Sequence, residues 1–80
     1  MAQPQDTIPI HTATDIGRMV RAARKQNGLT LAEAAGLTCV GVRFLSELEN
    51  GKPTVQLEKV LRVITALGLR LQLVSPFGQE

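Results

Sequence analysis

The segment from Thr30 to Gly51, TLAEAAGLTCVGVRFLSELENG, contains the pattern that decides the fold of this chain. It predicts two short helices joined by a tight turn, the second of which ends at Asn50-Gly51. Helical spacing places Leu45 and Leu48 on the inward side of the second helix and leaves a polar face outside. A polar helix face of this kind can enter the major groove of DNA, where the base edges are exposed. The segment therefore predicts a small DNA-binding domain.

The chain before this segment predicts a further helix that begins near Ala13. Thr12, followed three positions later by Asp15, resembles a capping box, in which two side chains bond reciprocally to the first backbone N–H groups. Gly28 is well placed to end this helix. Helical spacing gathers its inward side chains on one face: Ile16, Met19, Val20, Ala23 and Asn27. Residues 1–11, which mix Pro, Gln, Asp and Thr, are expected to form a flexible arm.

The two helices of the opening segment have their own boundary signals. Thr30 and Glu33 form a second capping box, which predicts a helix that runs to about Leu37. The next helix is expected to begin near Gly41. Its outward face carries Arg43 and Glu47, flanked by Phe44 and Ser46. These outward side chains are the candidates for contact with DNA bases.

One acidic residue of that helix, Glu49, lies on the face that is expected to be buried. The helical wheel places Glu49 inward, near Leu45. A carboxylate buried without a partner is costly, so Glu49 needs a cation beside it. Arg24 lies on the edge of the apolar face of the first helix and is the natural candidate. We therefore expect a structural ion pair between Arg24 and Glu49.

The last helix is expected after a loop at Lys52-Pro53. Thr54 is interpreted as its cap, and Gly68 is expected to end it after Leu67. Its core-facing side chains are expected to be Leu57, Val60, Leu61, Ile64 and Leu67. Val63 lies off this stripe, so a second apolar contact is expected there.

The end of the chain changes its period. Residues 69–73 alternate apolar and polar side chains, which predicts a short β-strand: Leu69, Arg70, Leu71, Gln72 and Leu73. Ile8-Pro9-Ile10 is a poor partner because proline interrupts a strand ladder. Pairing with the same strand of a second copy would satisfy the backbone and give a twofold homodimer. The alternative is a frayed apolar tail.

The size of the chain also favours a dimer. Its 80 residues make one domain, which buries only about 60–65% of its unfolded surface and is marginally stable alone. Cys39 is the single cysteine, so no internal disulfide is available. A structural metal would need more ligands than the distant pair of His11 and Cys39 supplies, and no cofactor is expected. A second subunit remains as the source of extra stability.

The charge distribution suits a polyanion better than the net charge of +2 suggests. Four of the nine basic residues fall within eight positions: Arg18, Arg21, Arg24 and Lys25. A solvated helix face explains the same cluster equally well. No apolar run is long enough to span a membrane, and residues 1–6 lack the features of a signal peptide. The expected location is the cytoplasm, in association with the nucleoid.

The sequence gives little support to an enzyme. His11 falls in the expected flexible arm and Cys39 in a turn, so neither has a placed catalytic partner. No glycine loop of the kind that cradles phosphates is present. Cys39 is expected to be a small buried hydrophobe rather than a redox group.

The two helices of residues 30–51 resemble the XRE family of helix-turn-helix proteins, which is related to Cro and the phage repressors. The longer pattern RFLSELENGKPT at 43–54, followed by LEKVLRV at 57–63 and ALGLRL at 66–71, is similar to the HipB-type antitoxins. The similarity covers roughly residues 12–74. It implies an all-α, phage-repressor-like helix-turn-helix domain of four or five helices. It also implies that a short C-terminal strand pairs across a homodimer.

The resemblance implies a role for individual residues. Those that match base-facing positions of the recognition helix are Gly41, Val42, Arg43, Ser46 and Glu47. Asn50 and Lys52 match positions that contact the DNA backbone, and Leu31 occupies such a position at the start of the second helix. On this reading Arg18 and the N-terminus of the last helix, at Thr54, are also expected to contact phosphates. Arg24 and Glu49 match a buried ion pair of the phage repressors, in agreement with the wheel.

Three positions depart from the family pattern. Leu31 stands where many relatives have glutamine, so a phosphate contact there must come from its backbone N–H. Cys39 replaces the glycine of the turn, which suggests a less strict backbone requirement at that corner. Gly41 replaces a hydroxyl cap, which costs only a few tenths of a kcal/mol.

The resemblance also implies a biological role. HipB-type proteins bind a palindromic operator, repress their own operon and restrain a HipA-type serine/threonine kinase toxin. The expected organisation is therefore an arm (1–11), a DNA-binding and dimerisation domain (12–74) and a tail (75–80). The alternatives are a plain phage-repressor-like regulator and a module that mainly inhibits a kinase. In the tail, Phe77 is a possible toxin contact, although a disordered tail is equally compatible with the sequence.

Overall fold

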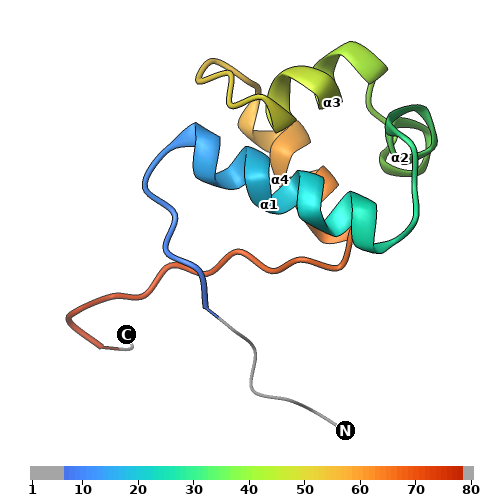
Figure 1. Ribbon diagram of the computed structural model, residues 1–80. Helices are drawn as coiled ribbons and strands as arrows, with labels where there is room; N and C mark the ends of the chain where they lie inside the picture. The colour runs from blue at the N-terminus through green and yellow to red at the C-terminus, as the bar shows by residue number, and fades with distance from the viewer. Residues whose placement is uncertain (1–6, 79–80) are drawn as a thin grey trace, which may run out of the picture.

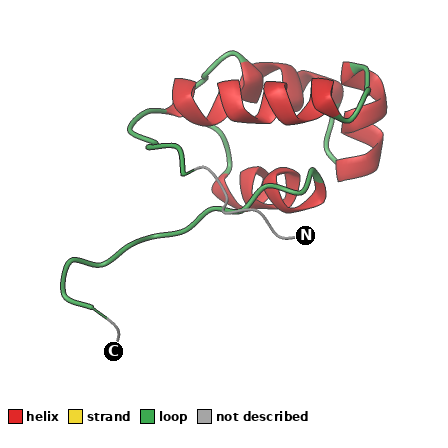
Figure 2. Ribbon diagram, turned by 60° about the horizontal axis from the view of Figure 1, so that its bottom comes forward, coloured by secondary structure: helices red, strands yellow, loops and turns green. Residues whose placement is uncertain are grey.

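A computed structural model describes residues 7–78 of the protein. Within this range the chain forms four helices and no strand (Figures 1 and 2). The helices are α1 (Ala13–Gln26), α2 (Leu31–Thr38), α3 (Val42–Glu49) and α4 (Leu57–Ala66). The all-α prediction is confirmed, with the lower of the two expected helix counts.

Both predicted capping boxes form. The hydroxyl of Thr12 accepts the backbone N–H of Asp15 at 3.2 Å, and the Asp15 carboxylate accepts the N–H of Thr12 at 3.1 Å. Thr30 and Glu33 repeat the arrangement at the start of α2, with distances of 3.1 and 2.8 Å. Each box satisfies two of the N–H groups that a helix leaves unpaired at its start. The starts of α1 and α2 are therefore encoded by residues three apart in the sequence.

All four helices end in the same way, with one residue in left-handed backbone conformation. These residues are Gly28, Cys39, Gly51 and Gly68, with φ angles of 70, 59, 83 and 85°. The expectation of a relaxed backbone requirement at Cys39 is wrong, because this residue adopts the strained conformation that glycine adopts without cost. The prediction that Cys39 is buried is also wrong, since its side chain is exposed.

The core lies between the four helices. Val20 of α1, Leu45 of α3 and Val63 of α4 are fully buried, and α2 contributes Ala34 and Ala35. The helix–helix contacts are most extensive between α1 and α3. This packing fixes one side of α3 and leaves its other side free.

Two predictions for the last helix are corrected. Thr54 does not cap α4: it lies in a turn, and Gln56 precedes the helix without a side-chain cap bond. The core-facing stripe is also displaced, because Val63 is fully buried while Leu57 and Leu61 are 65% and 40% exposed. Apolar residues occupy most of the circumference of α4, so helical spacing alone could not identify the side that faces the core.

The predicted strand is not formed in the single chain. Residues 69–73 have no strand partner within the described range, and the segment leaves the helices as an extended loop (Figure 2). Leu69 packs against the core, whereas Leu73 and Val74 are 98% and 85% exposed. A strand needs a ladder of hydrogen bonds to a neighbour, and the expected neighbour is a second copy. Parts of the predicted arm and tail, residues 1–6 and 79–80, lie outside the described residues.

Candidate nucleic-acid interface

The outward face of α3 displays the side chains that the sequence assigns to base contact. Arg43 is the most prominent, with 91% of its side chain exposed. Val42 is 47% exposed, and Gly41 directly before the helix is also exposed. Ser46 and Glu47 are half-buried one turn further along. The structure therefore brings all five predicted base-contacting residues to one helix and its N-cap.

The inward face of α3 holds the helix firmly. Leu45 and Leu48 are 0% and 2% exposed and form part of the core. Phe44 is half-buried against that core, and the ammonium of Lys59 on α4 lies 5.5 Å from its ring centroid. This distance allows a cation–π contact. Phe44 therefore has a structural role, although it flanks the outward face of the helix.

The N-terminus of α3 is less firmly fixed than its C-terminus. Gly41 has extended backbone angles (φ −72°, ψ 153°) and no side chain to cap the first N–H groups. A Cβ atom at Gly41 would meet nothing within 4 Å. The exposed position of Gly41 leaves room for another backbone to approach closely.

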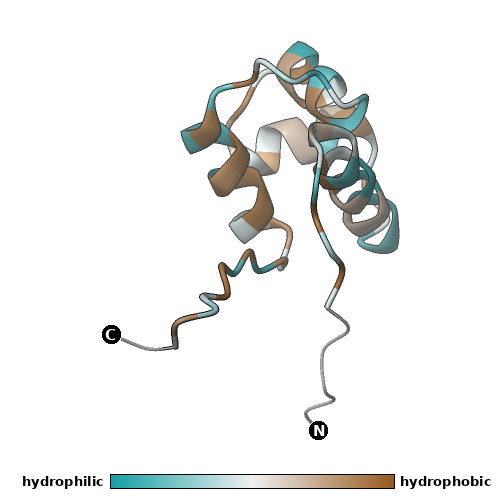
Figure 3. Cartoon of the chain, turned by 90° about the vertical axis from the view of Figure 1, so that its left-hand side faces the viewer, coloured by the Kyte–Doolittle hydropathy of each residue, from teal (hydrophilic) through white to brown (hydrophobic). Residues whose placement is uncertain are grey.

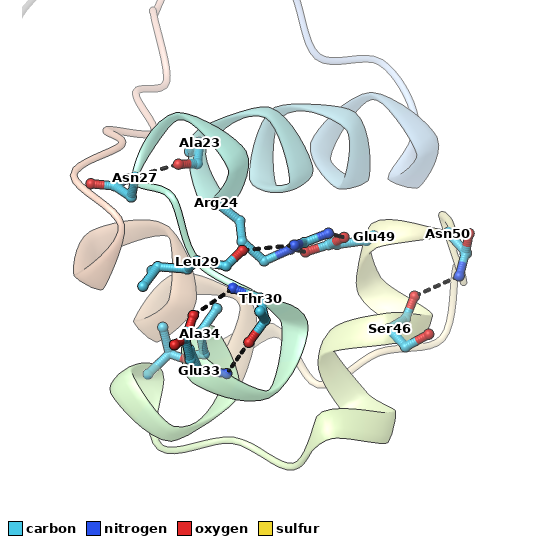
Figure 4. Close-up of polar contacts among 11 residues, drawn as sticks. Ala23, Arg24, Asn27, Leu29, Thr30, Glu33, Ala34, Ser46, Glu49 and Asn50 are labelled. Carbon is cyan, nitrogen blue, oxygen red and sulfur yellow. Dashed lines mark hydrogen bonds and ion pairs between the residues drawn. The ribbon is translucent and has the colours of Figure 1, made fainter.

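A buried ion pair joins α1 to the end of α3 (Figure 4). Arg24 donates from Nε and Nη2 to the two carboxylate oxygens of Glu49, at 2.7 and 3.0 Å. A third bond from Arg24 Nη1 to the carbonyl oxygen of Leu29 measures 3.0 Å. The side chains of the pair are only 12% and 6% exposed, and the bond to Glu49 raises the pKa of Arg24 further above its ordinary value. The predicted pair is confirmed.

The outer surface carries a second charge cluster around Glu47. Its Oε2 lies 3.3 Å from Nε of Arg43, and its Oε1 lies 3.3 Å from Nζ of Lys52. The pKa of Glu47 is lowered, mainly by the hydrogen bond from Lys52 and to a smaller extent by Arg43. Sequence analysis placed Arg43 and Glu47 on the same face of α3 but did not predict the contact between Glu47 and Lys52. Lys52 reaches Glu47 because the chain turns back at Gly51.

The residues assigned to the DNA backbone are more dispersed. Arg18 on α1, Lys52 and Thr54 are exposed, whereas Leu31 is half-buried against the core at the first position of α2. The side-chain amide of Asn50 is exposed and donates to the carbonyl oxygen of Ser46 at 2.8 Å (Figure 4). Thr54 lies in a turn three residues before α4, so a phosphate contact through Thr54 would not involve the N-terminus of that helix.

Residues 7–78 contain no group of three side chains suited to hold a metal ion. The same range has no helix with the length and apolar character that a membrane crossing requires. The exposed Arg62 of α4 donates to the carbonyl oxygen of Cys39 at 3.3 Å and thereby ties α4 to the turn between α2 and α3.

Comparison with solved structures places this arrangement among known folds. A HipA-HipB-O2-O3 complex contains a chain that matches with a TM-score of 0.77, covering 88% of this chain and 99% of that one. A HipB-O4 20mer complex matches with a TM-score of 0.76 and the same coverage. Both are 23% identical to this chain, which establishes a shared fold.

Comparison with other sequences identifies nearer relatives. An uncharacterised HTH-type transcriptional regulator, y4mF of Sinorhizobium fredii, is 46% identical over 67 residues, which cover 84% of this chain and 88% of that protein. The transcriptional regulator ClgR of Mycobacterium tuberculosis is 36% identical over 59 residues, or 74% of this chain and 53% of ClgR. The helix-turn-helix family matches residues 20–74. The chain therefore belongs to the helix-turn-helix (XRE/Cro) family of DNA-binding transcriptional regulators, which are not enzymes.

Proposed function

We propose that this regulator is a repressor that binds a palindromic operator, with Arg43 as its main base-reading residue. The observation that carries the proposal is the position of Arg43, fully displayed on a helix whose opposite face is buried. Its Nε bonds to Glu47, so its two terminal nitrogens are free for a bidentate contact to guanine O6 and N7. Glu47 then orients Arg43 rather than reading a base itself.

The remaining contacts divide between reading and positioning. The exposed Val42 would pack on a thymine methyl group, and Gly41 and Ser46 would complete the base-facing set. Contacts to phosphates come from Arg18, Lys52 and Asn50, together with the backbone N–H of Leu31 at the start of α2. Thr54 joins this set as an exposed side chain of the turn before α4. Phosphate contacts fix the register of the protein without reading sequence.

Replacing Arg43 with alanine is expected to abolish operator preference and leave weak, salt-sensitive binding. The bidentate contact contributes about 1–3 kcal/mol of discrimination in each half-site, so the preferred duplex should lose about fivefold to 150-fold in affinity per half-site. A preferred duplex is first enriched from a random library, and affinities are then measured by fluorescence anisotropy. Arg21→Ala removes an exposed charge from α1 and is the control. Unchanged discrimination in Arg43→Ala, or an equal loss in the control, would contradict the base-reading role.

The operator-binding species proposed here is a homodimer joined through residues 69–73. The leucines of this segment alternate with polar residues, and Leu73 is almost wholly exposed in the single chain. Figure 3 shows that α4 is largely apolar and that the segment after it alternates between apolar and polar residues. On α4 the exposed Leu57 and Leu61 offer further apolar surface to a partner. Antiparallel pairing of two copies would satisfy the backbone and bury these side chains. Twofold symmetry would place the two α3 helices about 34 Å apart, one turn of DNA.

Replacing Leu73 with aspartate is expected to give a monomer that keeps its helices. Leu73 makes almost no contact within its own chain, so the charge should disturb only the contact between subunits. Gln72→Asp places the same charge on the opposite face of the segment and should leave the dimer intact. Molar mass is measured by light scattering and helicity by circular dichroism. A wild-type protein that is monomeric at micromolar concentration would refute the dimer.

A second proposed role is that of an antitoxin that restrains a HipA-like serine/threonine kinase. The support is the HipB-type pattern of residues 43–71 and the HipB-like fold. Phe77 in the tail, 92% exposed, is the proposed toxin contact. If the adjacent gene encodes such a kinase, the full chain should retain it in a pull-down, and a chain ending at Val74 should retain less. Equal retention removes the tail from the contact. A phage lysogeny region beside the gene would favour a plain repressor.

A further inference from the structure

The carboxylate of Glu47 is held at both oxygens by different cations. Oε2 accepts from Nε of Arg43 and Oε1 accepts from Nζ of Lys52, each at 3.3 Å. A carboxylate with a single partner can rotate about its last bond, whereas two partners on different oxygens fix its plane. The orientation of Glu47 toward Arg43 therefore depends on Lys52.

The position of Lys52 is fixed by its backbone as well. Its N–H donates to the carbonyl oxygen of Glu47 at 3.0 Å, and the N–H of Gly51 donates to that of Leu48 at 3.1 Å. With Gly51 at φ 83°, these two bonds form a Schellman motif that ends α3. The motif returns the chain along the helix, so that both the backbone and the side chain of Lys52 bond to Glu47. The contact is thus part of the way the helix ends.

Lys52 also compensates the negative charge of Glu47. A carboxylate on a DNA-facing helix repels phosphates unless its charge is compensated. Lys52 is 45% exposed beside a half-buried Glu47, so it offsets this charge while Arg43 remains almost fully exposed. Without Lys52, Glu47 would be both less well oriented and more repulsive to DNA.

We infer that Lys52 is a positioning residue for sequence recognition, which acts through Glu47 on the guanidinium of Arg43. Lys52 fixes one oxygen of the Glu47 carboxylate, and the other oxygen holds Nε of Arg43 so that its terminal nitrogens face the bases. This inference rests on the proposed base-reading role of Arg43. It differs from a simple phosphate contact, which would strengthen binding to all sequences alike.

A double-mutant cycle on full-length protein tests this relay. Lys52→Met is made in the wild-type and in the Glu47→Ala background, and affinities are measured for the enriched duplex and for a duplex changed at the base pair that Arg43 reads. The ratio of the two affinities should fall about twofold to fivefold on Lys52→Met in the wild-type background, the size typical of coupling through exposed ion pairs. In the Glu47→Ala background the ratio should not change further. Lys25→Met, an exposed lysine of α1, controls for the loss of one charge and should show no coupling to Glu47.

The outcomes separate the relay from the function on which it rests. Lys52→Met could instead lower the affinity equally for both duplexes and in both backgrounds, and reduce the slope of log affinity against log salt concentration by about one. That result would show that Lys52 only contacts a phosphate and would overturn the relay. An increased ratio would overturn it as well. If Arg43→Ala leaves the ratio intact, the base-reading role itself fails. Thermal unfolding followed by circular dichroism confirms that each variant is folded.

Discussion

Replacing Glu49 with leucine is expected to destabilise the domain by about 3–5 kcal/mol, the cost of leaving a buried charge without its partner. Arg24 would keep its bond to the carbonyl oxygen of Leu29 but lose both bonds to the carboxylate. Its guanidinium cannot escape this cost by losing a proton, because its pKa is far above neutral. An 80-residue domain has a total stability of about 4–12 kcal/mol, so the variant should lose a large part of its stability. Thermal and urea unfolding by circular dichroism measure the loss.

The double variant Arg24→Met/Glu49→Leu distinguishes the cost of the charge from the cost of lost packing. It keeps similar side-chain volumes but removes both charges, so most of the lost stability should return. A double variant as unstable as Glu49→Leu would show that packing, rather than the unpaired guanidinium, causes the loss. A Glu49→Leu variant as stable as the wild type would contradict the structural role of the pair.

The features predicted best from the sequence are those that depend on hydrogen bonds between residues close in sequence, or on the free-energy cost of burying a charge. The capping boxes at Thr12 and Thr30 depend on residues three positions apart, and both form. The pair of Arg24 with Glu49 is a long-range contact, but helical spacing put a carboxylate inside and left only one suitable cation. Local bonding and the burial of charge therefore define the frame of the site.

The errors arose where several conformations fit the same pattern. Thr54 has the residue type of a cap, yet the chain continues through a turn and the helix begins three residues later. On α4, apolar side chains surround much of the helix, so the pattern could not separate the core side from the side of Leu57 and Leu61. Cys39 shows the reverse case, because the turn imposes a backbone conformation that its residue type disfavours.

Sequence analysis predicted which residues form the candidate site but not all of the contacts between them. Helical spacing put Arg43 and Glu47 on the outward face with Ser46 beside them, and the family resemblance added Gly41 and Val42. In the structure Gly41, Val42 and Arg43 are exposed, and Ser46 and Glu47 are half-buried. The link between Lys52 and Glu47 depends on the left-handed turn at Gly51, which brings together side chains that helical spacing does not pair. A helical wheel describes only residues within the helix, so it cannot predict a contact that depends on the geometry of the turn after it.

Replacing Gly17 with alanine is expected to destabilise the domain by about 2 kcal/mol or more, although alanine favours helices by about 1 kcal/mol over glycine. Gly17 is buried where α1 crosses the last turn of α3. A Cβ atom there would lie 2.8 Å from the backbone oxygen of Glu49 and closer still to that of Leu48. Backbone atoms cannot turn aside as a flexible side chain can, so the two helices would have to separate. Separation would also strain the bonds between Arg24 and Glu49, which join the same helices.

Gly36→Ala is the matched control, since it makes the same substitution inside α2. A Cβ atom at Gly36 would meet nothing within 4 Å, and its backbone φ is not positive. Only the helix preference remains, so this variant should gain about 0.5–1 kcal/mol. The melting temperatures should therefore move in opposite directions, by about 4–8 °C for each kcal/mol. If Gly17→Ala also raised the melting temperature, α1 and α3 would not lie as close together as the structure has them. The packing that holds the recognition helix α3 against α1 would then be wrong.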